Sequence, residues 1–153
     1  MAVITEITYE QCLPLWEMLW AKRTSPIEPT SAMILPADRG EVREYSTQIG
    51  TPTFIGIMLH GELIGVNSFH TIGEDQTRSR GLYVLGAHRG KGVGTLLLSA
   101  TIVKAPAGRF LWSYPKEESL NTYLRAGFVQ ASNKIVDTIE NKSNYYVTFP
   151  LEK

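Results

Sequence analysis

Glycines and cations are concentrated in one stretch of this sequence, residues 89–94, which reads Arg-Gly-Lys-Gly-Val-Gly. A β-type run at residues 82–85 precedes it, and a run with helical spacing at residues 95–103 follows it. A strand, a glycine-rich turn and a helix start direct backbone N–H groups, and the positive end of the helix dipole, toward one point. Two of the residues add positive charge, and glycine lets a ligand approach the backbone closely. The stretch therefore predicts a diphosphate cradle made by Arg89, Gly90, Lys91, Gly92, Val93 and Gly94.

The spacing of these residues does not fit two familiar phosphate loops. A P-loop requires Gly-Lys followed by Ser or Thr, and the Gly-Lys at residues 90–91 is followed by Gly. The dinucleotide fingerprint requires Gly-x-Gly-x-x-Gly, whereas the glycines here alternate with single residues. The pattern that fits is Gln or Arg, two residues, Gly, one residue, then Gly or Ala. A surface turn with a helix behind it is the alternative, so the flanking residues must distinguish a phosphate-binding loop from such a turn.

A second informative stretch, residues 119–128, reads as a helix that ends in Arg-Ala-Gly-Phe. Gly127 is predicted to cap this helix in the left-handed conformation, and Phe128 to begin a strand. Tyr123 stands four residues before the Gly-Phe pair. With the cradle, these residues resemble the GCN5-related N-acetyltransferases (the GNAT family), whose coenzyme A loop follows a strand and whose tyrosine precedes a Gly-Phe pair. The predicted order of elements resembles that family over nearly the whole chain.

The resemblance implies an α/β (α+β) fold, with a mixed, mainly antiparallel central sheet of six to seven strands, flanking helices and a splayed parallel pair at the cofactor site. It implies acetyl-CoA as co-substrate, with the pantetheine arm along Leu82, Tyr83 and Val84 and a minor contact from Asn121. The backbone N–H of Val84 would polarise the thioester carbonyl. Tyr123 would protonate the departing thiolate. A buried aromatic that closes the helix onto the sheet is the alternative for Tyr123.

The sequence departs from the family at two positions. Lys116 stands seven residues before Tyr123, where members often have asparagine. The strand that leads to the loop begins Gln-Thr-Arg-Ser-Arg at residues 76–80 and offers no carboxylate as a base. The remaining candidates for the base are Glu28, His70, Glu74 and Asp75, with deprotonation through water as the alternative.

The acceptor contacts that the sequence offers are few. Arg23 and Glu28 lie in a proline-rich stretch, residues 23–36, which reads either as a functional loop or as a connector. His70 ends a predicted strand, where a solvent-facing histidine is the alternative to an acceptor contact. These three residues are the predicted acceptor contacts.

Composition limits the class of protein. A chain of 153 residues predicts a single domain over residues 1–153. Fifteen basic residues balance fifteen acidic ones, which argues against a nucleic-acid partner. The lone cysteine, Cys12, excludes an internal disulfide and a cysteine-based zinc site, and no metal site is predicted. It reads as a small buried thiol. No apolar run has membrane-spanning length, so a cytoplasmic protein without a membrane partner is expected.

Periodicity and turn residues predict the elements that position these groups. A strand at residues 3–8 is followed by a helix at 9–22. Thr8 can cap this helix, and Pro14 is tolerable in it if the helix starts near Gln11. A polar helix at 37–50, which Gly50 ends, comes next. A hairpin turning at His60-Gly61 joins strands at 53–59 and 62–70, and a charged turn at 74–79 leads to the strand that reaches Val84. The strand at 109–113 should run parallel to it, because a helix separates the two. A helix at 117–126 and two strands, at 128–137 and 144–151, follow.

The sequence leaves the function between two classes. The first is an N-acetyltransferase in which a small-molecule or peptide amine attacks acetyl-CoA directly in a ternary complex. The second is a non-catalytic module that binds or senses acyl-coenzyme A, which the missing carboxylate favours and Tyr123 disfavours. The acceptor, the length of the acyl group and the homodimer that the resemblance allows through the final strands are left open.

Overall fold

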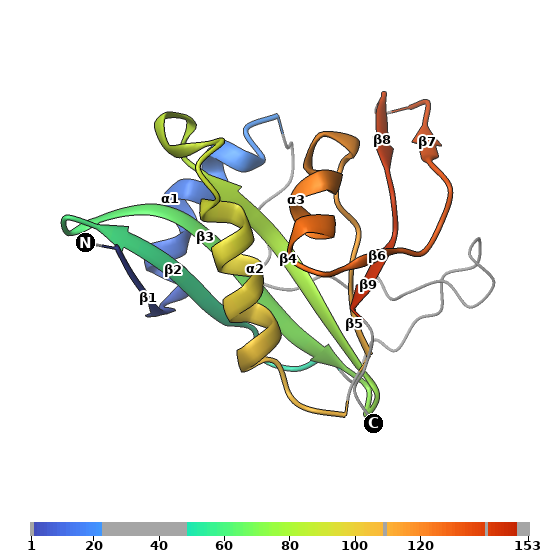
Figure 1. Ribbon diagram of the computed structural model, residues 1–153, viewed down its shortest axis with the longest axis horizontal. Coiled ribbons are helices and arrows are strands. Elements are labelled where there is room, and N and C mark those ends of the chain that lie inside the picture. Colours follow the sequence, from blue (N-terminus) through green and yellow to red (C-terminus); the bar gives the residue numbers. More distant parts are fainter. Residues whose placement is uncertain (1, 23–48, 109, 140, 150–153) are drawn as a thin grey trace.

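A seven-stranded sheet runs through the computed structural model, which describes residues 2–22, 49–108, 110–139 and 141–149 (Figure 1). The strand order among these residues is β1-β2-β3-β4-β5-β9-β6. Neighbouring strands are antiparallel except β4 and β5, which run parallel. The strands are β1 (Ala2–Ile7), β2 (Thr53–Leu59), β3 (Glu62–Ile72), β4 (Gln76–Val84), β5 (Phe110–Ser113), β6 (Val129–Gln130) and β9 (Val147–Phe149). The predicted mixed, mainly antiparallel sheet with one parallel pair is confirmed.

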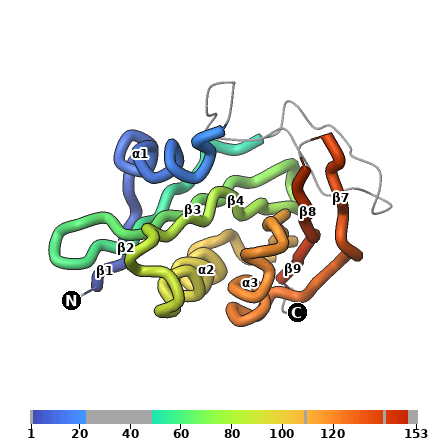
Figure 2. Tube along the Cα trace, turned by 90° about the horizontal axis from the view of Figure 1, so that it is seen from above, coloured from blue at the N-terminus to red at the C-terminus, as the bar shows by residue number. Residues whose placement is uncertain are grey.

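Helices cover both faces of this sheet. Helix α1 (Tyr9–Leu19) lies on one face, and α2 (Val93–Lys104) and α3 (Leu120–Arg125) lie on the other (Figure 2). The short 3-10 helices η1 (Gly86–His88) and η2 (Glu117–Ser119) precede α2 and α3. The helix predicted at residues 117–126 is therefore divided into η2 and α3. Strand β4 lies between the two helical layers and carries side chains toward both.

Helix α1 begins where its capping residues place it. The Gln11 N–H donates to the Thr8 hydroxyl at 3.1 Å, and the Thr8 N–H donates to the Gln11 side chain at 2.8 Å. These bonds form a complete capping box, which fixes the first turn at Tyr9. The predicted Thr8 cap is confirmed, and the later start near Gln11, considered because of Pro14, does not occur. Pro14 stands inside the helix and is exposed, so the backbone hydrogen bond that it cannot make is lost at the solvent face.

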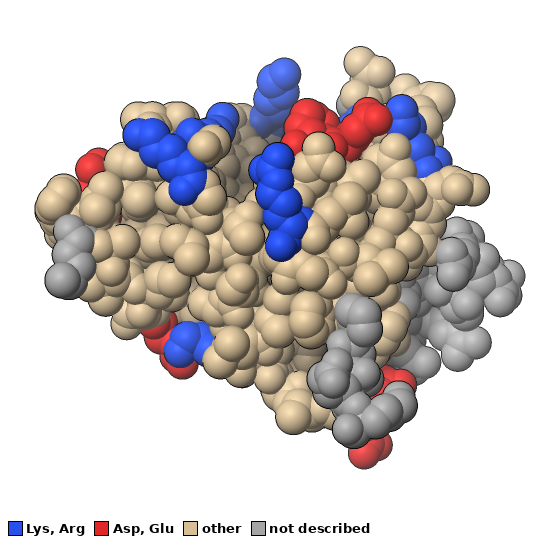
Figure 3. Space-filling view, viewed as in Figure 1, with Lys and Arg blue, Asp and Glu red and all other residues tan. Residues whose placement is uncertain are grey.

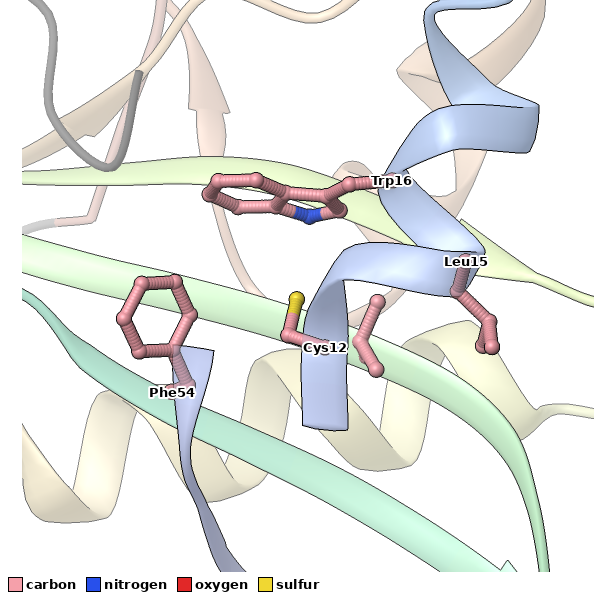
Figure 4. Close-up of a cluster of buried hydrophobic side chains, with 5 residues drawn as sticks. Cys12, Leu15, Trp16 and Phe54 are labelled. Carbon is pink, nitrogen blue, oxygen red and sulfur yellow. The ribbon is translucent and has the colours of Figure 1, made fainter. Parts of the chain in front are cut away.

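The apolar face of α1 packs on the sheet through Cys12, Leu15 and Trp16, which form a cluster with Phe54 (Figure 4). Cys12 is fully buried, as the sequence predicted. Burial raises the pKa of its thiol to about 12. Because the thiolate is the nucleophilic form, a thiol this hard to ionise is unsuited to carry an acyl group.

The hairpin predicted at His60-Gly61 joins β2 and β3. Both turn residues have positive φ, 52° and 80°, as a two-residue type I′ turn requires. Strand β3 continues to Ile72, beyond the predicted end at residue 70. The next turn is confined to residues 73–75, so the charged turn predicted at 74–79 was wrong for residues 76–79. Those residues belong to β4, and most of them are buried in the sheet although their side chains are polar.

The loop predicted at residues 23–36 and most of the helix predicted at 37–50 lie outside the described residues. The last two positions of that helix, Ile49 and Gly50, are described and are extended. Ile49 bridges to Ile72, and the Gly50 N–H donates to the Thr71 carbonyl at 2.8 Å. Gly50 therefore lies along β3, with its N–H bonded to that strand.

The C-terminal part forms four short strands where two long ones were predicted. Strands β6 and β9 join the main sheet, whereas β7 (Ile135–Asp137) and β8 (Lys142–Asn144) form a separate two-stranded sheet. Polar side chains interrupt the strands: Gln130 Nε2 donates to the Ser132 carbonyl at 2.9 Å, and the Tyr146 N–H donates to Ser132 Oγ at 3.0 Å. Such local bonds replace the bonds of a sheet ladder and turn the chain.

Candidate active site

Strands β4 and β5 pair over a short length and then separate. Their parallel pairing covers Gln76 to Arg78 on β4 and Phe110 to Trp112 on β5. Strand β4 continues to Val84, whereas β5 ends at Ser113. The opening between them is a pocket of about 270 Å³. Its lining comes from both faces of the sheet: Leu19, Trp20, Arg78, Ser79, Arg80, Gly81, Leu82, Ser113, Tyr114, Pro115, Lys116, Ser119, Tyr123, Lys142 and Asn144.

A bulge in β4 lies at this opening. Val66 pairs with Tyr83 and Ser68 with Arg80, so Gly81 and Leu82 together oppose the single residue Asn67. Gly81 has a φ of 82°, the left-handed conformation of a glycine bulge. The Trp16 indole N–H donates to the Gly81 carbonyl at 2.8 Å, which ties the bulge to α1. A glycine inside a strand pattern is the sequence signal that would have found this bulge.

The predicted cradle has the backbone that an anion site needs. Gly90 and Gly92 have φ of 75° and 82°, and Gly92 is the N-cap of α2. A Cβ at either glycine would meet no other atom within 4 Å, so the space in front of both is open. The first bond of the helix joins the Leu96 N–H to the Gly92 carbonyl, which leaves the preceding N–H groups of the first turn for a ligand.

Arg89 fastens this loop to the end of β4. Its Nε donates to the Val84 carbonyl at 2.8 Å, and its guanidinium lies 5.2 Å from the centroid of the Tyr83 ring. Lys91 is exposed. Figure 3 shows Lys and Arg side chains over the part of the surface where the loop after β4 lies in Figure 1. The cradle therefore combines backbone donors with positive charge.

Helix α3 packs beside the cradle. A Cβ on Gly94 would come within 3.0 Å of Thr122 Cγ2, which is a tight contact, and its next neighbours are Leu82 and Val84. The predicted cofactor residues at the end of β4, on the loop and on α3 are therefore brought to one side of the sheet. Asn121 is exposed on α3 and is not part of the pocket lining.

Tyr123 is held by the motif that ends α3. The Phe128 N–H donates to the Tyr123 carbonyl at 3.0 Å, and the Gly127 N–H donates to the Leu124 carbonyl at 3.1 Å. With Gly127 at a φ of 105°, these bonds form a Schellman motif. The Phe128 ring packs edge-on against Tyr123 at 5.3 Å. The predicted cap at Gly127 thus aims the tyrosine into the pocket.

The hydroxyl of Tyr123 faces two serines on the splayed strands. Ser113 Oγ lies 3.4 Å from the phenolic oxygen and donates to the Ser79 carbonyl at 2.7 Å. Tyr123 is 3% exposed. Burial raises the pKa of its phenol above the usual 10, against the smaller lowering effects of Ser113, Arg78 and Ser79. The phenol is therefore protonated at neutral pH.

Two arginines that the sequence reasoning overlooked line the opposite side of the pocket. Arg80 stacks on the rings of Trp16 and Trp20, at 5.3 and 4.8 Å, and Arg78 stacks on Trp112 at 5.1 Å. Arg78 is 8% exposed. Burial, followed by the neighbouring charge of Arg80, lowers the pKa of the Arg78 guanidinium to about 10. Their signal in the sequence was two arginines at alternate positions of a central strand, where buried charge is rare.

The structure does not bring the predicted base candidates to this pocket. His70 was expected at the end of a strand, but β3 continues past it, and its side chain is buried at a position paired with Arg78. The solvent-facing alternative was therefore wrong, and His70 is not among the described residues that line the pocket. Glu74 and Asp75 are exposed in the turn before β4. Arg23 and Glu28 lie outside the described residues.

Comparison with known proteins agrees with this architecture. The model of the acetyltransferase (GNAT) family matches residues 14–128, and the chain therefore belongs to this family. No curated protein matches the chain in sequence.

Solved structures share the fold at low sequence identity. Escherichia coli ElaA has 14% identity and a TM-score of 0.68, with 98% of this chain and all of that chain covered. An N-acetyltransferase from Staphylococcus aureus Mu50 has 16% identity and a TM-score of 0.67, with 99% of both chains covered. A GNAT family acetyltransferase from Elizabethkingia anophelis with acetyl-CoA bound has 18% identity and a TM-score of 0.59, with 98% of both chains covered. None of the helices in the described ranges has the length and apolar character needed to cross a bilayer.

Proposed function

We propose that this protein is an acetyl-CoA-dependent N-acetyltransferase in which an amine attacks the thioester directly. The observation that carries the proposal is the juxtaposition of the glycine cradle and Tyr123 on the same face of the sheet, beside the splayed strand β4. Family membership supports an acyl-CoA-dependent acyltransferase, and one structural neighbour was solved with acetyl-CoA bound. Acetyl-CoA would supply the activated acetyl group. The remaining chemistry falls to residues of this chain.

The cradle would hold the diphosphate. The open space before Gly90 and Gly92 and the first-turn N–H groups of α2 match the size and charge of phosphate oxygens. Arg89 and Lys91 would add charge, and the anchoring of Arg89 on Val84 would keep the loop beside the strand. The pantetheine arm would then extend along Leu82, Tyr83 and Val84.

The backbone N–H of Val84 is the candidate donor to the thioester carbonyl. The Leu85 N–H donates to the Ile64 carbonyl in β3 at 2.9 Å. Because successive N–H groups of a strand point in opposite directions, the Val84 N–H points away from β3, toward the side where β5 has ended. A fixed donor at that position would stabilise the oxyanion as it develops.

Tyr123 is the candidate acid. Its phenol is protonated at neutral pH and stands at the pocket, so it would give its proton to the departing thiolate as the carbon–sulfur bond breaks. A thiolate formed in the same buried surroundings is itself poorly solvated, which raises its affinity for that proton. The proton released by the acetylated amine would restore the phenol.

The pocket makes a carboxylate base unnecessary. Its described lining contains four cations, Arg78, Arg80, Lys116 and Lys142, and no acidic side chain. Nearby positive charge lowers the pKa of a bound ammonium and so increases the fraction of neutral, nucleophilic amine. Water can then accept the proton that the bound ammonium loses before the attack. This reading gives a physical reason for the missing carboxylate on β4.

Calorimetric titration with acetyl-CoA, followed by a thiol-release assay on a panel of amines, tests the proposal. Binding with amine-dependent thiol release is the expected result. Absence of acetyl-CoA binding would contradict the cradle and the proposal with it. A binding or sensing module is the second candidate, because the lining lacks an acidic base. Tight binding without release on any amine would favour that module.

A further inference from the structure

The α1 side of the pocket is cationic and aromatic, and this combination selects among amines. We propose that the acceptor is a small amine that also carries a carboxylate, and that Arg78, assisted by Arg80, binds this carboxylate. The inference rests on the proposed function and adds the chemical class of the acceptor. Its central observation is a buried, uncompensated arginine that lines the pocket.

Arg78 is held in place by packing. Its guanidinium lies on the Trp112 ring, which belongs to a buried cluster with Ile72 and Tyr146. Its Nε and Nη1 atoms are covered by protein and make no hydrogen bond within the described part of the chain. No ion pair joins its guanidinium to a carboxylate of the described residues. Because Arg78 also lines the pocket, its uncompensated charge acts on a partner bound there.

A buried charge without a counter-ion destabilises the folded protein, because the charge has lost its hydration and gained no partner. The cost is visible in the lowered pKa of Arg78, for which burial is the largest cause and the charge of Arg80 the next. A ligand carboxylate would reverse both effects, because it supplies oxygen acceptors and an opposite charge at once. Retaining two arginines side by side on a central strand is understandable if an anion binds between them.

The other groups of this side fit a small molecule. Lys116 and Lys142 extend the positive lining, and Trp20 and Tyr114 supply flat apolar surface for the carbon chain of the acceptor. Asn144 is buried, and its amide donates to the Tyr114 carbonyl at 3.0 Å, which holds these two lining residues together. A volume of about 270 Å³ is at the small end for ligand pockets, which favours a compact acceptor.

The first experiment compares matched amines on the wild-type enzyme. Each pair differs only in a carboxylate against a carboxamide, such as 4-aminobutyrate and 4-aminobutyramide, over a series of chain lengths. We expect the best carboxylate to exceed its amide by roughly tenfold or more in kcat/KM, as a charge-assisted contact implies. A carboxylate without an amine, such as butyrate, should compete with the acceptor. Equal rates within every pair, or a phosphonate that surpasses the carboxylate, would overturn the assignment.

The second experiment removes the charge. Arg78→Gln should raise KM for the carboxylate about tenfold or more and should abolish the preference for the carboxylate over its amide. Arg125→Gln, at an exposed position in the last turn of α3, is the matched control and should leave the preference unchanged. An equal fall of kcat on both members of a pair would assign Arg78 to the reaction centre and overturn the inference.

Failure of this inference and failure of the proposed function give different results. If the protein binds acetyl-CoA and acetylates neutral amines but shows no preference for a carboxylate, only the acceptor assignment is contradicted. If the wild-type protein does not bind acetyl-CoA, the proposed function is contradicted. If Arg78→Gln does not fold, the comparison of paired amines and the butyrate competition on the wild-type enzyme still decide the question.

Discussion

The two sides of β4 differ in the chemical groups that they present, backbone N–H groups on one side and side chains on the other. On the side of α2 and α3, the cradle consists of backbone N–H groups and glycines within a few residues of one another, and Tyr123 is aimed by a cap four residues away. On the side of α1, the pocket consists of arginine and aromatic side chains from α1, β4, β5 and the segment around β8. The first arrangement suits a donor common to a family, and the second suits an acceptor particular to one enzyme.

The largest effect is expected at Gly81, where the α1 side is joined to the bulge. A Cβ there would approach the Trp16 ring to about 2.5 Å, and the residue has positive φ. Gly81→Ala should therefore destabilise the protein by about 3 kcal/mol, from overpacking and backbone strain together. Gly108→Ala has similar φ but open space, and should cost about 1 kcal/mol. Equal shifts of the two variants in urea unfolding would show that Trp16 does not constrain the bulge.

On the cradle side, Gly92→Asp should weaken acetyl-CoA binding about a hundredfold or more, because a carboxylate would face the diphosphate. The matched control is Gly61→Asp, which places the same residue at a similar positive φ and in equally open space in the β2–β3 turn. Calorimetry should find wild-type affinity for the control. If both variants bind acetyl-CoA normally, the cradle is misplaced.

On the same side as the cradle, Tyr123→Phe should lower kcat about a hundredfold with little change in acetyl-CoA affinity. The buried ring and its contact with Phe128 are retained, so the free energy of unfolding should change by about 1 kcal/mol or less. Steady-state kinetics and calorimetry check the two halves of this prediction. A parallel loss of affinity and stability would assign the tyrosine to packing alone.

The smallest effect concerns pH. The raised pKa of Tyr123 means that its acid form persists to pH 10 and beyond, so the rate should show no alkaline fall below about pH 10. The rate should instead rise with pH as the acceptor amine loses its proton. Rate profiles between about pH 6 and 10 for two amines of different pKa check this. A rise that is the same for both amines would reveal a titrating base in the protein.

Cys12 adds a stability test with a definite sign. Its pKa is about 12 when folded against 9.0 ordinarily, so ionisation favours the unfolded chain. The stabilisation is complete below pH 9 and falls by about 1.4 kcal/mol per pH unit above it, until the folded pKa is reached. Cys12→Ala should remove this part of the pH dependence of the free energy of unfolding, measured in denaturant between about pH 9 and 10. Other residues that ionise in this range are present in both proteins, so their effect cancels in the comparison.

The sequence by itself determined the parts of this protein that depend on neighbours along the chain. The glycine cradle at residues 89–94, the cap at Gly127, the Thr8 cap and the His60-Gly61 turn each follow from backbone conformations that only certain residues adopt. The GNAT family and the mixed sheet were predictable from these signals taken together.

Tertiary structure alone decided the α1 side of the pocket. The burial of Arg78 and Arg80 was missed because nothing nearby in the sequence shows that Trp16, Trp20 and Trp112 cover them. His70 read as a strand end because only the length of the β3–β4 ladder buries it. Helix α1, strand β5 and the segment around β8 meet because the parallel pair opens where β5 ends, and that convergence depends on strand order and register, which no local pattern specifies.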